Sequence, residues 1–304
     1  MRTRAIRCSL AVLAALIVMV LSASAQGTDF SRVDIKTTKI ADNFYTLEGQ
    51  GGAIGALVGP DGVLLVDAQY AQLTEKIVAA VRKISNNQIR FLINTHVHGD
   101  HTGGNENFGK LGVTLFSRDQ LRYRLAHPTP AASGAPGTPA PAAALPVVTY
   151  NGKVTFHLNG EDVEAIPIPA AHTDGDTLVR FSNADVLMTG DYFRSTGYPN
   201  IDRANGGTLQ GMLDGIGFTI GLTGPNTKVI PGHGAIVDRA GLTAHRDMIL
   251  AIRDRVAKLV QQGKTQEEVI AAKPTSDYDA RVPGVGTTAD RFVGQVYAEL
   301  KGLK

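Results

Sequence analysis

The stretch THVHGDHTGG, residues 95–104, places three histidines and one aspartate within six positions. It follows IRFLIN, residues 89–94, whose apolar character predicts a buried β-strand. In an extended segment, residues two apart project to the same side, so His96 and His98 can bind one metal ion. Four metal-binding side chains at the end of an apolar strand favour a metal site over ordinary surface or core histidines.

The second half of this stretch lies beyond the strand end, where the chain turns. Asp100 and His101 can therefore face a second ion beside the first. Gly103 and Gly104 have no side chains, so they let the turn and the next helix approach closely.

Three more residues of metal-binding type lie downstream, each at the end of a predicted strand. They are His172 in PAAHTDGD, Asp191 in MTGDYF and His233 in IPGHG. The other histidines of the chain after residue 100 are predicted to be surface or packing residues, because none lies at a strand end beside another ligand type; they are His127, His157 and His245.

Short apolar runs alternate with amphipathic helical patterns along the chain, which indicates an α/β protein. Strands are expected at residues 63–68, 89–96, 112–117, 177–182, 185–190 and 227–232, with a hairpin over 153–168 that turns at Asn159-Gly160. Helices are expected at residues 71–84, 118–126, 207–222 and 240–262.

The ordered set of ligand-type residues resembles the metallo-β-lactamase superfamily, through H-x-H-x-D-H at 96–101 and the three later positions. The resemblance covers about residues 38–240. It implies a four-layer αββα sandwich with the metal site at one edge of two facing sheets. It also implies a ligand set of His96, His98 and His172 for one metal, of Asp100, His101 and His233 for the other, and of Asp191 bridging both.

The ligand types suit two divalent ions, with zinc expected and iron or manganese left open. Two adjacent dications lower the pKa of a shared water and generate hydroxide near neutral pH, which can attack a carbonyl or phosphoryl centre. Asp100 is the expected catalytic residue, because it would orient this nucleophile as well as bind a metal.

Two residues after Asp191 are candidates for substrate binding. Arg194 lies three positions on, where β-lactamases with a cysteine ligand have a lysine that holds the substrate carboxylate, and arginine can bind a carboxylate with two hydrogen bonds. Tyr198, in the same loop, could line the pocket; simple packing of Tyr198 and a solvated surface position for Arg194 are the alternatives.

These observations favour a hydrolase of a small ester, lactone, thioester or amide. A zinc β-lactamase is one alternative, and an iron-dependent sulfur oxidoreductase or a non-catalytic metal-binding protein of the same fold is another. Relatives with a carboxylate bridge often carry a second histidine three or four positions after the first, whereas this chain has Asp176 there.

The N-terminus predicts export. Three arginines precede the apolar run Leu10–Leu21, and the small residues Ala23 and Ala25 follow, as in a signal peptide (residues 1–25) cut after Ala25. Cleavage would remove Cys8, the single cysteine, and change the formal charge from +2 to −1. We therefore expect a periplasmic or secreted protein that acts on a small-molecule substrate, without a membrane anchor and without a nucleic-acid partner.

The remaining residues, 26–304, are predicted to form a single domain. In the whole chain 43% of the residues are hydrophobic, which is enough for a sizeable core. Residues 127–146 are rich in proline and alanine, and we interpret them as a surface insertion because metal-binding motifs lie on both sides. The oligomeric state is left open.

Overall fold

The computed structural model describes residues 28–130, 134–282 and 286–303. The predicted signal peptide, with Cys8, lies outside the described residues. Contacts divide the chain into residues 1–32 and 33–304, and the described part of the first unit contains one 3-10 turn, Phe30–Arg32. Within the described residues, no helix is both long enough and apolar enough to cross a bilayer.

The first sheet has seven strands arranged in chain order. These are β1 (Lys36–Lys39), β2 (Phe44–Glu48), β3 (Ile54–Leu57), β4 (Val63–Val66), β5 (Ile89–Ile93), β6 (Thr114–Arg118) and β7 (Val148–Tyr150). Strands β1 to β4 form an antiparallel meander, and β4 to β7 run parallel. The parallel half therefore points the carboxyl ends of its strands to one edge.

The second sheet has five strands in the order β12-β11-β10-β9-β8. Their bounds are β8 (Val154–Leu158), β9 (Glu161–Pro167), β10 (Thr177–Phe181), β11 (Val186–Met188) and β12 (Lys228–Ile230). The predicted hairpin is confirmed as β8–β9, and Asn159 and Gly160 both have positive φ (55° and 72°), as a type I′ turn requires. Within the described residues of this sheet, β11 and β12 pair in parallel and the other neighbouring strands are antiparallel.

The two sheets face each other across an apolar core. Phe44 of the first sheet meets Phe181 of the second with ring centroids 4.4 Å apart, and Leu64 and Val163 are fully buried in the same cluster. Strand β4, with the sequence VLLV, is buried on both faces, which explains its continuous apolar character.

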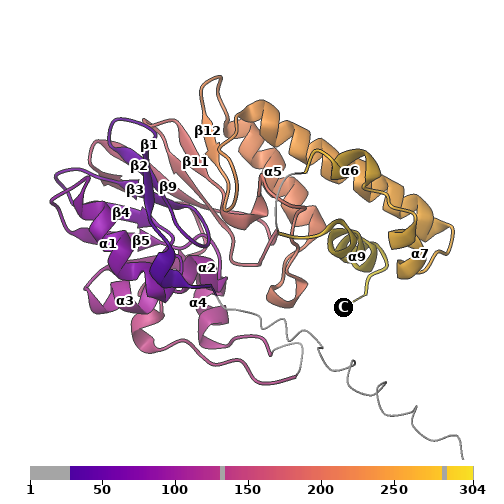
Figure 1. Cartoon of the computed structure of the whole chain (residues 1–304), viewed down its shortest axis with the longest axis horizontal. Helices are drawn as coiled ribbons and strands as arrows, with labels where there is room; N and C mark the ends of the chain where they lie inside the picture. The colour runs from indigo at the N-terminus through magenta and orange to yellow at the C-terminus, as the bar shows by residue number, and fades with distance from the viewer. Residues whose placement is uncertain (1–27, 131–133, 283–285, 304) are drawn as a thin grey trace, which may run out of the picture. The chain divides into compact units, whose positions relative to one another are not determined.

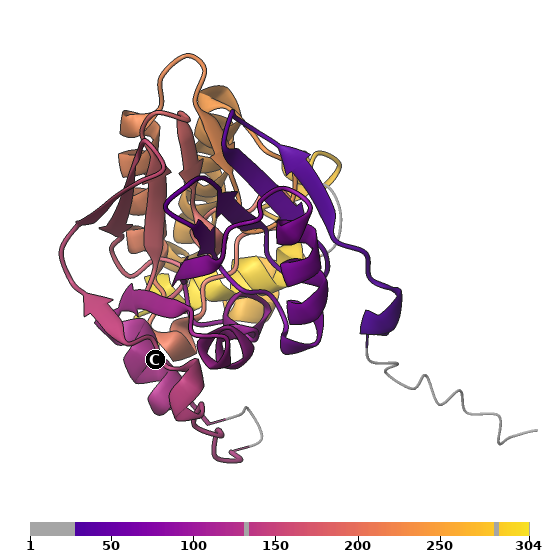
Figure 2. The same cartoon turned by 90° about the vertical axis from the view of Figure 1, so that its left-hand side faces the viewer.

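Helices cover the outer face of each sheet, so the predicted αββα sandwich is confirmed (Figures 1 and 2). On the second sheet lie α5 (Leu209–Leu222), α6 (Arg239–Gln261) and α9 (Ala289–Leu300), with α7 (Gln266–Ala271) and α8 (Ser276–Asp279) beside them. Near the first sheet lie α1 (Thr74–Arg82), α2 (Gly99–Thr102), α3 (Asn105–Lys110) and α4 (Asp119–Ala126).

The described part of the proline- and alanine-rich segment ends against α3. Residues Ala142–Ala144 form a 3-10 turn, Ala144 is buried, and its carbonyl oxygen accepts a hydrogen bond of 3.2 Å from the Asn105 side chain. This end of the segment is thus packed on the first sheet's helix layer, just before β7.

Candidate metal centre

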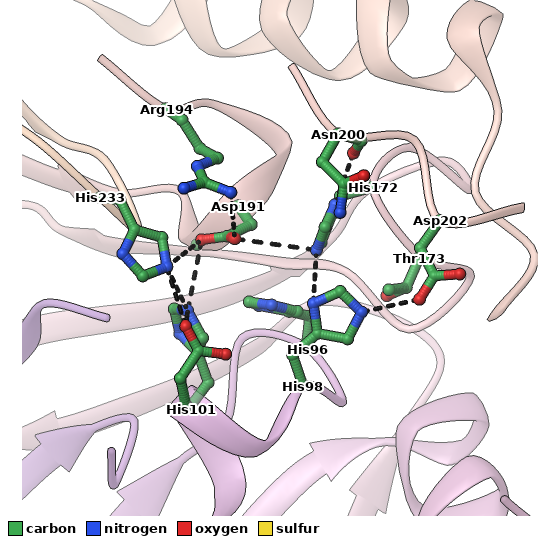
Figure 3. Close-up of polar contacts among 12 residues, drawn as sticks. His96, His98, His101, His172, Thr173, Asp191, Arg194, Asn200, Asp202 and His233 are labelled. Atoms are coloured by element: carbon green, nitrogen blue, oxygen red, sulfur yellow. Dashed lines mark hydrogen bonds and ion pairs between the residues drawn. The ribbon is translucent and has the colours of Figure 1, made fainter. Parts of the chain in front are cut away.

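The structure brings all seven predicted metal-binding residues together at one edge of the sandwich. Figure 3 shows the five histidines and Asp191 of this set. Each of the seven follows the end of a strand or lies in the short helix after it: His96 and His98 after β5, Asp100 and His101 in α2, His172 after β9, Asp191 after β11 and His233 after β12. The first sheet supplies the motif at 96–101, and the second sheet supplies the other three residues.

The ligand atoms form two groups. His96, His98, His172 and Asp191 offer atoms within 4.8 Å of one another, and so do Asp100, His101 and His233. In the first group, His172 Nε2 lies 3.0 Å from His98 Nδ1. In the second, His233 Nε2 lies 3.0 Å from Asp100 Oδ2 and 3.4 Å from His101 Nε2.

Asp191 lies between the two groups. Its Oδ1 is 3.2 Å from His101 Nε2 and 3.4 Å from His233 Nε2, whereas its Oδ2 is 3.8 Å from His172 Nε2. One carboxylate oxygen therefore faces each group, as a bridging ligand requires.

Two acidic residues outside the ligand set hold the second nitrogen of a ligand histidine. Asp202 Oδ2 lies 2.7 Å from His98 Nε2, and Asp67 Oδ2 lies 2.7 Å from His101 Nδ1. Each contact fixes the tautomer, so that His98 presents Nδ1 and His101 presents Nε2 to the site. Neither aspartate was predicted from the sequence, although Asp67 directly follows the buried strand β4, the neighbour of β5.

Backbone and hydroxyl groups do the same for the other two histidines of the first group. His172 Nδ1 lies 2.6 Å from the carbonyl oxygen of Asn200, and His96 Nδ1 lies 3.1 Å from Thr95 Oγ1. His172 and His96 therefore present Nε2 to the site. His96 Nε2 is buried and has no hydrogen-bond partner among the described residues, so its lone pair is free for a metal ion.

The electrostatics also fit cations. Burial lowers the pKa of His172 to about 4 and lowers that of His96, so both imidazoles are neutral ligands at pH 7. Burial opposes the charge of Asp191 too, but His101 and His233 hold the pKa of this carboxyl well below its usual range. For Asp100, burial is the largest single effect and raises the pKa, but the hydrogen bond with His233 and the charges of His101 and His233 together lower it to about 2. A metal ion in the first group would meet the neutral imidazoles of His96 and His172 and the ionised carboxylate of Asp191. In the second group, Asp67 and Asp191 raise the pKa of His101 well above its usual range despite burial, so a metal ion there would displace a proton from this ring.

Two glycines let the backbone lie directly against ligands. A Cβ on Gly232 would be 2.0 Å from Asp191 Oδ1, and a Cβ on Gly52 would be 2.1 Å from Cε1 of His101. Any side chain at either position would displace the ligand. The predicted close approach at Gly103 and Gly104 is also confirmed, since a Cβ there would lie 2.4 and 2.5 Å from the carbonyl oxygens of Gly99 and Ala68.

A family comparison agrees with this geometry. The model of the metallo-β-lactamase superfamily matches residues 49–242, which is more than half of the chain and contains all seven ligands. The chain belongs to the metallo-β-lactamase superfamily.

Three relatives illustrate distant likenesses to this chain. A hydroxyacylglutathione hydrolase of Nitrosococcus oceani is 29% identical over 173 residues, a match that spans 55% of this chain and 57% of that relative. The sec-alkylsulfatase Pisa1 from Pseudomonas sp. superposes with a TM-score of 0.67 at 16% identity, over 87% of this chain and 50% of that one. A metallo-β-lactamase from Pontibacter korlensis superposes with a TM-score of 0.57 at 19% identity, over 71% of this chain and 99% of that one. These likenesses show the superfamily fold.

The two candidate substrate-binding residues lie in different surroundings. Arg194 reaches the metal centre, with Nη1 3.6 Å from Asp191 Oδ2 and a side chain that is 14% exposed. The structure does not bring Tyr198 to the centre: it is buried in the core of helices α5, α6 and α9, and its hydroxyl donates a hydrogen bond of 2.6 Å to Asp279 Oδ1.

Asp176, which occupies the region where some superfamily members have a further histidine, is not near enough to join either ligand group. Its carboxylate accepts hydrogen bonds from the backbone N–H of His172 (2.7 Å) and from Thr173 Oγ1 (2.6 Å). Burial raises its pKa to about 7. Asp176 thus shapes the turn that carries His172.

Proposed function

We propose that this superfamily member is an exported, dinuclear zinc hydrolase of a small ester, lactone, thioester or amide. The observation that carries the proposal is Asp191, whose two carboxylate oxygens face two separate groups of ligand atoms. Five imidazoles and two carboxylates are donors that zinc accepts well.

When bound, two divalent ions would supply a nucleophilic hydroxide near neutral pH and polarise the oxygen that gains charge. Asp100 would orient the attacking water. Its side chain is 21% exposed, whereas that of Asp191 is 3% exposed, so Asp100 is the carboxylate that water and substrate can reach. Its low pKa keeps it ionised and able to accept a hydrogen bond.

The surroundings of Arg194 support a substrate with an anionic group and an apolar part. The Arg194 side chain is 14% exposed and its Nη1 lies 3.6 Å from Asp191 Oδ2, so its guanidinium can meet a carboxylate that enters the metal centre. A pocket of about 310 Å³ adjoins Arg194; its lining includes Phe193, Val237, Met248, Tyr278 and a second cation, Arg281, but none of the seven metal-binding residues. The relative named hydroxyacylglutathione hydrolase makes a thioester the first substrate class to test.

The test is a hydrolysis panel on protein reconstituted with zinc, containing an acyl thioester, a lactone, an aryl ester, a cephalosporin and a phosphodiester. We expect two zinc ions per chain by elemental analysis, hydrolysis of at least one carbonyl substrate, and loss of activity with a strong chelator. A single iron together with oxygen uptake on a persulfide would instead identify a sulfur oxidoreductase.

β-Lactam hydrolysis is the second candidate function. Arg194 favours this function. It lies three residues after Asp191, and its side chain reaches the metal centre, where it could bind the carboxylate of a β-lactam substrate. Turnover of the cephalosporin at a higher kcat/KM than the thioester, lactone and ester would establish this function in place of the first.

Arg194→Ala should raise KM by roughly tenfold or more for substrates that carry a free carboxylate, since a charge-assisted hydrogen bond contributes about 1.5–3 kcal/mol. Matched neutral substrates should change little. Arg194→Lys keeps the charge but not the two parallel donors, so its KM for carboxylate substrates should lie between that of the wild type and that of Arg194→Ala. Equal losses on charged and neutral substrates would show that Arg194 does not bind the carboxylate.

A further inference from the structure

The C-terminal helix α9 contacts the loop that orients the metal ligands. This loop, residues 193–208, contains Asn200 and Asp202, the partners of His172 and His98. Helix α9 lies beyond residue 242 and thus outside the part of the chain that matches the superfamily model. One α9 side chain, that of Gln295, makes two hydrogen bonds to the loop.

Gln295 and His172 each hydrogen-bond to the same peptide group, the one between Asn200 and Ile201. The N–H of Ile201 donates to Gln295 Oε1 at 3.1 Å, and the carbonyl oxygen of Asn200 accepts from His172 Nδ1 at 2.6 Å. The Asn200 carbonyl and the Ile201 N–H belong to one planar peptide unit. A hydrogen-bonded chain therefore runs from Gln295 through this peptide to the His172 ring.

The orientation of the Gln295 amide is determined by its partners. A backbone N–H can only donate, so the atom facing Ile201 is the carbonyl oxygen Oε1. The other end, Nε2, then donates to Asn200 Oδ1 at 3.0 Å. Gln295 thus holds both the side chain of Asn200 and the peptide that follows it.

Such a chain has two effects on His172. It fixes the plane of the peptide whose oxygen accepts from Nδ1, and this sets the direction in which Nε2 points. It also polarises the peptide, because each hydrogen bond in a chain strengthens the next. A stronger acceptor at Nδ1 makes Nε2 a better metal ligand.

We propose that Gln295 is a positioning residue for the metal group built on His96, His98 and His172. The inference rests on the metal binding of the proposed function. It assigns part of the metal affinity to α9, a helix outside residues 49–242 that match the superfamily model. The hydrogen bonds of Gln295 go to Asn200 and Ile201 and not to a metal-binding side chain. Gln295 therefore acts through the peptide between Asn200 and Ile201.

The test compares two leucine variants of α9, using Zn²⁺ and a competing chelator to measure binding to the full-length protein. Gln295→Leu should weaken the zinc ion of the His172 group by about tenfold, the low end of the range for residues that orient a ligand. The matched control is Glu299→Leu, one turn along α9, which loses hydrogen bonds to the backbone N–H groups of Leu209 and Gln210 and none to this peptide. Its zinc affinity should stay within about twofold of the wild type.

A second measurement separates positioning from general loss of stability. In the zinc-loaded protein with ¹⁵N-labelled histidine, the His172 Nδ1–H proton should shift upfield in Gln295→Leu and stay in place in Glu299→Leu. Gln295→Glu keeps an acceptor for Ile201, and the Asn200 amide can turn to donate to it. This variant should recover wild-type zinc affinity to within about twofold and move the resonance downfield.

Equal zinc affinities in the wild type and Gln295→Leu, or equal losses in both leucine variants, would overturn the inference while leaving the dinuclear site intact. If Gln295→Leu does not fold, an unshifted resonance in Gln295→Glu overturns it, and a downfield shift supports it. A wild-type protein that binds no zinc would overturn the proposed function as well.

Discussion

Four of the five histidines at the metal centre have their second ring nitrogen held by a group outside the ligand set. The holding groups differ in strength: two are carboxylates, one is a peptide carbonyl and one is a hydroxyl. An imidazole whose second nitrogen is fixed loses its alternative tautomer and its freedom to rotate. The centre is therefore organised before any cation binds.

The proposed bridging role of Asp191 can be tested by two substitutions. Asp191→Asn keeps the size of the side chain but removes the charge that screens two dications from each other. We expect this variant to lose most of its activity and about one zinc per chain, measured by elemental analysis. Asp191→Cys offers a thiolate, which zinc binds well, so it should keep zinc and some hydrolysis.

The control is the wild-type protein loaded and dialysed in parallel. An asparagine variant with two tightly bound zinc ions and a near-normal kcat would show that Asp191 is not a ligand, and the dinuclear assignment would then be wrong.

Among the elements, helix α6 carries a partly buried histidine that is not one of the predicted metal ligands. His245 packs edge-on against Phe193 with ring centroids 4.9 Å apart, and its Nε2 has no partner among the described residues. Burial lowers the pKa of His245 to about 4. The folded state therefore keeps this imidazole neutral, whereas the unfolded chain takes up a proton below about pH 6.5.

His245 should make stability depend on pH. Its contribution is fully present above about pH 6.5 and is lost as the pH falls toward 4, because protons then favour the unfolded chain. Between pH 7 and pH 5 the loss should approach about 2 kcal/mol in the free energy of unfolding. His245→Leu and His245→Gln should both lack this part of the pH dependence in urea unfolding at the two pH values. Wild-type pH dependence in both variants would contradict the burial of a neutral imidazole.

The sequence predicted some elements well and gave no signal for others. Continuous apolar runs such as β4, and the Asn159-Gly160 turn, have local physical causes that can be recognised in the sequence. Strand β1, KTTK, has no apolar alternation and exists because it pairs with β2, so only the fold reveals it.

The metal centre shows the same division. Its ligands could be predicted because histidines and aspartates recur at strand ends, whereas Asp202 and Gln295 are single polar residues in a loop and a helix. Asp202 lies 104 residues from its partner His98, and Gln295 lies 94 and 95 residues from its partners Ile201 and Asn200. Only the tertiary structure therefore shows their roles. Tyr198 was a candidate for the pocket because of its loop, but its loop folds inward against α8 and α9.

At the scale of the whole molecule, the N-terminal segment carries a prediction about processing. If residues 1–25 are a signal peptide, the mature protein should begin at or near Gln26. N-terminal sequencing of protein recovered from the periplasm or the medium checks this directly. Soluble cytoplasmic protein that retains Met1 would contradict the predicted export.

The division of the ligands between the two sheets has a consequence for when and how metal can be held. His96, His98, Asp100 and His101 follow a strand of the first sheet, and the other three ligands belong to the second, so neither half of the chain holds a complete site. If the proposed pair of ions is bound, a nascent or unfolded chain could not retain it, and metal loading would have to follow folding. Once bound, cations at this edge would fasten the sheets together, adding about 2.7 kcal/mol of stability at a free metal concentration one hundred times the Kd. The stability of the folded protein would then depend on the concentration of free metal around it.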